Sequence, residues 1–115
     1  MSELERAVRR MLLAFLDRKL KAYAHFAGAN WRSLYVHAMS DSQLQDWLER
    51  HSKYFDHSTC AQLWIDLAQA DCYTKFLGNI PELEDVTNRV ADFAQGLRDL
   101  IHFLDANGIK VYVFY

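Results

Sequence analysis

The strongest constraint on the fold is a run of apolar residues between residues 79 and 108. The spacings alternate between three and four positions, which places all of these side chains on one side of an α-helix. The run consists of Leu83, Val86, Val90, Phe93, Leu97, Leu100 and Leu104. Ala94 and Ile101 widen this apolar side, as is usual in a helix that faces a core. We therefore expect a long central helix over about residues 81–106.

The ends of this helix also carry signals. Asn79 followed by Glu82 resembles a capping box, and Pro81 has the backbone angle that a first helical turn needs. Asn107-Gly108 supplies a left-handed stop at the other end. Before the central helix, the polar segment 56–59 offers several N-caps for the preceding helix.

Other parts of the chain have helical periodicity as well. We expect helices over about residues 3–27, 42–54 and 60–78, and a short helix within 30–39, for which a strand over 34–39 is the alternative. One proline and four glycines in 115 residues favour long elements with short connections. The prediction is a single, mainly α domain, residues 1–115, built as a compact bundle of four or five helices around the central helix.

The last seven residues, 109–115, are different in kind. They are rich in β-branched and aromatic types and directly follow Asn-Gly, which predicts one C-terminal β-strand. A lone strand cannot satisfy its own backbone hydrogen bonds, so it needs a second strand. The candidates are residues 33–39, the same segment of a second subunit in a homodimer, or a strand of another protein. The predicted partner contacts in this segment are Val111, Tyr112, Phe114 and Tyr115.

Charge is spread unevenly along the chain. Residues 1–32 carry seven basic against three acidic residues, whereas residues 33–115 carry six against twelve. A basic first helix can steer an acidic protein partner, so we predict contacts by Arg6, Arg9 and Arg10. Nucleic acid is disfavoured, because the basic residues spread around the helix and the pI is about 6.2. A small nucleic-acid-binding regulator that uses this helix is an alternative function.

An alternative is that these arginines pair with acidic residues of the same chain. Asp85, Asp92 and Asp99 recur every seven residues on the central helix. Three interpretations are open: the aspartates form a solvated polar face, they bind a basic partner along the helix, or they are counter-charges for the arginines of the first helix.

No arrangement of residues in the sequence supports catalysis. There is no phosphate-binding loop, no dinucleotide fingerprint and no flanking signature for a nucleophilic cysteine. A metal or thiol site at His51, His57 and Cys60 is a further alternative, but structural zinc needs four ligands. We therefore expect no catalytic residues, no metal and no cofactor.

The two cysteines bear on the compartment. Cys60 and Cys72 would be about 18 Å apart on one helix, too far for a disulfide. Free cysteines favour a reducing compartment, and no stretch predicts a signal peptide or a membrane span. We expect a cytoplasmic protein that does not enter a membrane.

These observations favour a non-enzymatic protein-binding module, namely a small cytosolic inhibitor that covers a surface of a larger protein. Compact helical chains of this size without motifs are similar in kind to toxin-immunity proteins and to phage-borne inhibitors of bacterial defence. This is a likeness of class that no particular residue carries.

Overall fold

The computed structural model of the chain describes residues 2–27, 40–51, 53 and 55–111. The helices in this part are α1 (Glu3–Ala27), α2 (Asp41–His51), α3 (His57–Leu77) and α4 (Glu84–Ala106), with a short 3₁₀ helix, η4 (Pro81–Leu83), directly before α4. The prediction of a mainly helical fold is confirmed. The predicted short helix within 30–39 lies outside the described residues.

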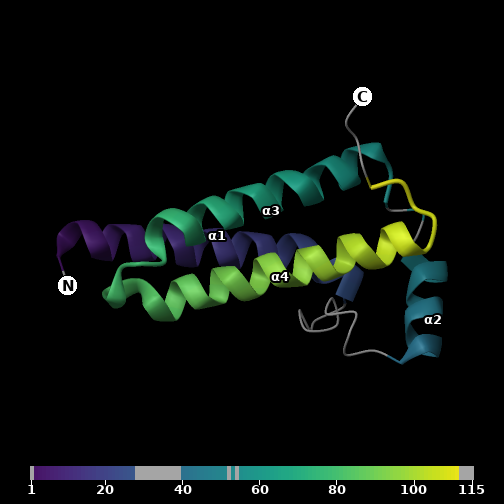
Figure 1. Cartoon of the computed structure of the whole chain (residues 1–115), viewed down its shortest axis with the longest axis horizontal. Coiled ribbons are helices and arrows are strands. Elements are labelled where there is room, and N and C mark those ends of the chain that lie inside the picture. Colours follow the sequence, from purple (N-terminus) through teal and green to yellow (C-terminus); the bar gives the residue numbers. More distant parts are fainter. Residues whose placement is uncertain (1, 28–39, 52, 54, 112–115) are drawn as a thin grey trace.

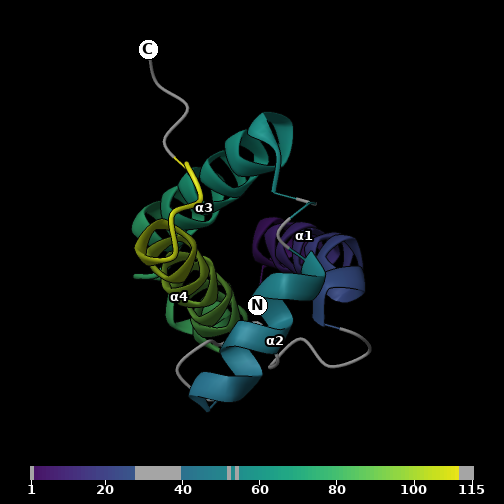
Figure 2. The same ribbon diagram turned by 90° about the vertical axis from the view of Figure 1, so that its right-hand side faces the viewer.

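The three long helices lie side by side, and α2 lies across one end of them (Figure 1). Seen end-on, α1, α3 and α4 form the corners of a triangle (Figure 2). α3 runs antiparallel to α1 and α4, because the chain reverses direction between α3 and α4 at Gly78. Of the described helices, none has a stretch long and apolar enough to cross a membrane.

The core forms around α4, as the sequence predicts. All seven residues of the apolar run are buried, with at most 1% of each side chain exposed. Opposite them lie Leu12, Phe15 and Leu16 of α1, and the Phe15 and Phe93 rings meet edge to face with centroids 5.9 Å apart. Burial of this many large apolar side chains is the main free-energy term that holds the three long helices together.

The predicted ends of the helices agree with the structure at two places. Asp56 is the N-cap of α3, and its Oδ1 accepts a hydrogen bond of 2.8 Å from the backbone N–H of Thr59. Gly108 has a φ of +83°, the left-handed conformation that Asn107-Gly108 predicts after α4.

The predicted capping box of Asn79 and Glu82 is wrong. The N-cap is Ile80, which is extended and makes no side-chain capping hydrogen bond, and Pro81 opens a 3₁₀ turn. The reason is steric, because a residue directly before proline is pushed out of the helical region. The helix therefore starts after Ile80, one residue too late for Asn79 to cap it.

The C-terminal segment also departs from the prediction, because no strand is found in the described part of the chain. Val111 is fully buried, and its carbonyl oxygen accepts a hydrogen bond of 2.6 Å from Nε1 of Trp64 on α3. A side-chain donor thus satisfies a backbone group for which a second strand was expected. Residues 112–115 lie outside the described residues, so the remainder of the predicted strand stays a prediction.

Candidate binding surface

α3 carries two apolar stripes on opposite sides. The first faces the core and contains the buried residues Cys60, Leu63, Leu67 and Ala70. The second, which we call the outer stripe, repeats at spacings of four, three, four and four positions and therefore lies on one side of the helix. The outer stripe consists of Ala61, Ile65, Ala68, Cys72 and Phe76.

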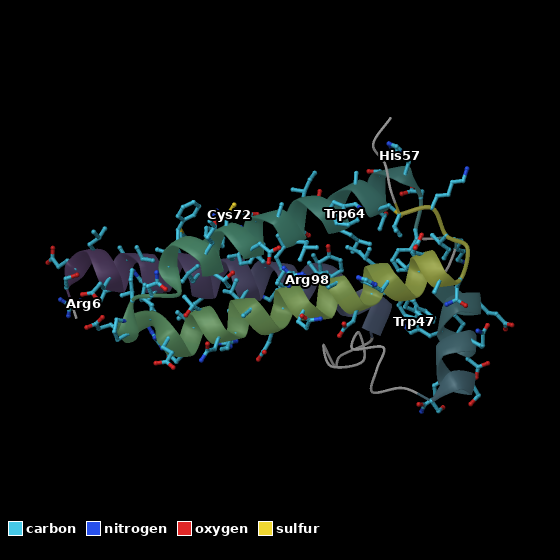
Figure 3. All side chains as sticks on the ribbon, viewed as in Figure 1. Arg6, Trp47, His57, Trp64, Cys72 and Arg98 are labelled. Carbon is cyan, nitrogen blue, oxygen red and sulfur yellow. The ribbon has the colours of Figure 1, made fainter. Side chains whose placement is uncertain are left out.

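The outer stripe is open to solvent. The exposed fractions of Ile65 and Phe76 are 56% and 70%, and Ala68 and Cys72 are also exposed. In Figure 3 the side chain of Cys72 points away from α4 and marks the outer side of α3. Exposed apolar side chains that line up on one side of a helix are candidates for a contact surface.

The charged residues of α3 are placed off this stripe. Asp66 is buried and pairs with Lys19 of α1, whereas Asp71 is partly exposed and pairs with Arg98 of α4. The intervening outward positions, Ser58, Gln62 and Gln69, are uncharged. Lys75 lies at the edge, with its Nζ 5.5 Å from the centre of the Phe76 ring. The outer stripe is therefore an apolar surface with one basic residue at its edge.

The neighbouring helix α1 has an exposed apolar residue at about the same level as Phe76. The rings of Phe15 on α1 and Tyr73 on α3 meet with centroids 5.1 Å apart, which fixes the register of the two antiparallel helices. Met11, about one turn before Phe15, is therefore level with Phe76, which follows Tyr73 by about one turn. Met11 is 42% exposed.

A buried polar cluster lies on the side of α3 that faces α1. Oδ1 of Asp66 accepts from Nζ of Lys19 at 2.8 Å and from Nε2 of Gln62 at 2.7 Å, and Oδ2 accepts from the hydroxyl of Tyr23 at 2.6 Å. Burial, together with this hydrogen bond to the carboxylate, raises the pKa of Tyr23. Both carboxylate oxygens have partners, so the cluster is suited to fixing α3 against α1.

The arginines predicted to bind a partner have different environments. Arg9 forms a bidentate ion pair with Asp85 of α4, with distances of 2.6 and 2.5 Å, and this pairing lowers the pKa of Asp85. The prediction that the aspartates of the central helix offer counter-charges to the first helix is thus met at this pair. Arg6 and Arg10 are exposed.

The other predicted contact residues lie at the C-terminal segment. Val111, which was predicted to contact a partner, is buried in the core of its own chain. The remaining three, Tyr112, Phe114 and Tyr115, lie outside the described residues.

The alternative metal or thiol site includes His51, whose side chain is not described; among the described side chains, no group of three or more His, Cys, Asp or Glu could hold a metal ion. Cys60 is buried, and its Sγ lies 3.6 Å from the carbonyl oxygen of Phe55. Burial raises the pKa of this thiol, which disfavours the reactive thiolate. His57 is exposed on the first turn of α3, and the side chain of His51 is not among those described.

Comparison of the chain with protein-family models, curated proteins and solved structures gives no match.

The sequence contains the signal for the outer stripe, since the spacing of Ile65, Cys72 and Phe76 is visible in it. The helix expected over residues 60–78 was not predicted to contact a partner.

Proposed function

We propose that this protein is a non-enzymatic protein-binding module and that the outer stripe of α3 is its principal contact surface. The observation that carries the proposal is the exposure of Ile65 and Phe76 on one apolar side of α3, at 56% and 70%. A binding partner would remove this apolar area from water, and each large side chain that becomes fully buried contributes about 1.5–3 kcal/mol.

The form of the surface favours recognition between helices or between a helix and a groove. The two large side chains are eleven positions apart on one side of a 21-residue helix, as anchors of such interfaces commonly are. Aromatic anchors such as Phe76 are typical of the residues that dominate binding energy.

The more specific proposal is a small inhibitor that covers a surface of a larger protein. Arg6 and Arg10 support it, because both are exposed on α1 and neither makes an ion pair with another described residue. An acidic surface of the larger protein would complement them. Arg9 is less suited to this task or to binding nucleic acid, because Asp85 occupies its guanidinium group.

The test is affinity capture from a bacterial lysate by wild type and by the double variant Ile65→Lys/Phe76→Lys, with Asn88→Lys on the exposed side of α4 as the control for added charge. We expect wild type and the control to retain the same proteins and the double variant to lose them. Circular dichroism checks that the variants keep their helices. Retention of the same proteins by all three would contradict the proposal.

A further inference from the structure

The outer stripe has a property that bears on which protein covers it. Its large residues, Ile65 and Phe76, alternate with small residues, so that the stripe has knobs and gaps along one side of α3. We propose that a second copy of this chain docks on it, with the two α3 helices antiparallel and related by a twofold axis. This inference rests on the proposed function, and it names a second copy of the chain, in place of a larger protein, as the partner at the same surface.

The pattern of sizes supports the antiparallel pairing. When the twofold axis passes between residues 68 and 69, Ile65 of one copy lies opposite Cys72 of the other, and Phe76 lies opposite Ala61. Each large side chain then meets a small one, and the symmetry repeats both pairs. A parallel pairing would instead place Phe76 against Phe76 and Ile65 against Ile65, with the small residues facing one another across gaps.

The charge pattern agrees with a second copy as the occupant. Each chain has a formal net charge of −2, so two copies repel weakly at long range. In this pairing no charged side chain meets its own equivalent across the outer stripe, because the residues of the stripe are uncharged and Lys75 at its edge lies opposite Gln62 of the second copy. A strongly charged partner would lose the hydration of many of its charges against this mostly apolar surface.

The size of the surface sets the strength of the association. A face of a 21-residue helix is about 32 Å long and about 10 Å wide, so two copies would bury on the order of 600 Å² through α3 alone. Stable complexes bury at least about 1,200 Å². We therefore expect a reversible dimer that forms in the range of tens to hundreds of micromolar.

The first experiment measures molar mass by sedimentation equilibrium from about 10 µM to 1 mM. We expect the average mass of the full-length chain to rise from 13.5 kDa towards twice that value. Ile65→Lys should weaken the dimer at least tenfold, because it places a charge opposite Cys72 of the second copy. Asn88→Lys adds the same charge on α4 and should leave the dimer constant within twofold.

The second experiment tests the antiparallel register by disulfide formation under a mild oxidant. In Ile65→Cys, the new thiol lies opposite Cys72 of the other copy, and facing Cα atoms of closely packed helices are within disulfide range. We expect a dimer band on a non-reducing gel for this variant. Wild type should give none, because the two Cys72 residues are seven positions apart along the axis, about 10 Å. Asn88→Cys serves as the control for random collisions.

The outcomes separate this inference from the proposed function. A chain that remains monomeric at 1 mM, or a wild type that cross-links readily through Cys72, overturns the antiparallel dimer. If the monomeric chain still captures another protein in a manner that Ile65→Lys/Phe76→Lys abolishes, the protein-binding function stands and the second copy is the wrong partner.

Discussion

The hydroxyl of Tyr23 on α1 donates a hydrogen bond of 2.6 Å to Oδ2 of Asp66 on α3, in a site where the aspartate is only 1% exposed. The two residues are 43 positions apart in the chain, so this contact forms only when α1 and α3 pack in one register. Lys19 pairs with the other oxygen of the same carboxylate. Loss of either partner would leave a buried charge incompletely solvated.

Tyr23→Phe tests this cluster. The variant keeps the ring in the core and removes one hydrogen bond to a buried carboxylate, so we expect a loss of about 1–3 kcal/mol in the free energy of unfolding. Urea denaturation followed by circular dichroism measures the change. Tyr73→Phe is the matched control, since the Tyr73 hydroxyl is only partly buried, and it should cost less. Equal losses in the two variants would argue against a special role for Asp66.

The ion pair of Arg9 with Asp85 gives a pH dependence. Pairing with Arg9 lowers the pKa of Asp85 in the folded state, so the ionised carboxylate adds stability above its ordinary pKa of about 4. This contribution is lost as the pH falls through the lower folded-state pKa. We expect wild type to exceed Asp85→Asn in thermal stability at pH 7 by a modest margin, which high salt reduces. The margin should close as the pH falls below 4, and a margin that widens in acid would contradict the assignment.

The contact of Trp64 with the carbonyl of Val111 predicts how the C-terminal segment is held. Trp64→Phe retains an aromatic ring but lacks the indole N–H, so we expect a loss of about 1 kcal/mol. Hydrogen exchange of the backbone amides at 109–111 should become faster, because local opening of this segment is easier. The amides in the middle of α1 provide the internal control. Unchanged exchange at 109–111 would mean that burial of the Val111 side chain alone anchors the segment.

The central position of α4 predicts a contrast between two leucines. Leu97 is fully buried, so Leu97→Ala should lower the free energy of unfolding by about 2–5 kcal/mol. Leu4 is 74% exposed near the start of α1, so Leu4→Ala should change it by less than about 0.5 kcal/mol. Thermal unfolding of both variants checks the difference. A comparable loss in Leu4→Ala would show that its side chain is covered in solution.

Periodicity in the sequence was sufficient to predict the framework of the fold. The alternation from Leu83 to Leu104 located the central helix, and Gly108 marked its end, because both signals act within a few residues of one another. The bounds of α1 also agree with the prediction over 3–27. Signals of this kind depend on local geometry and need no knowledge of the tertiary structure.

Long-range contacts explain what was missed. The segment from residue 109 has a high strand propensity, but Trp64, almost fifty positions earlier, supplies the hydrogen bond that replaces a strand neighbour at Val111. The cluster around Asp66 depends on the register between α1 and α3, which no local pattern specifies. The candidate surface is a different case. The spacing of Ile65, Cys72 and Phe76 is visible in the sequence, but spacing alone does not say which of the two apolar sides of α3 stays exposed.

Because α3 has an apolar stripe on each of two sides, hydrophobic burial alone does not decide which stripe faces the core. A half-turn of the helix would bring Ile65 and Cys72 towards the core in exchange for Leu63 and Leu67. Asp66 decides between the two orientations of the helix, because only one of them brings its carboxylate to Lys19 and Tyr23. A charge inside the bundle thereby selects which side of α3 remains available to other molecules.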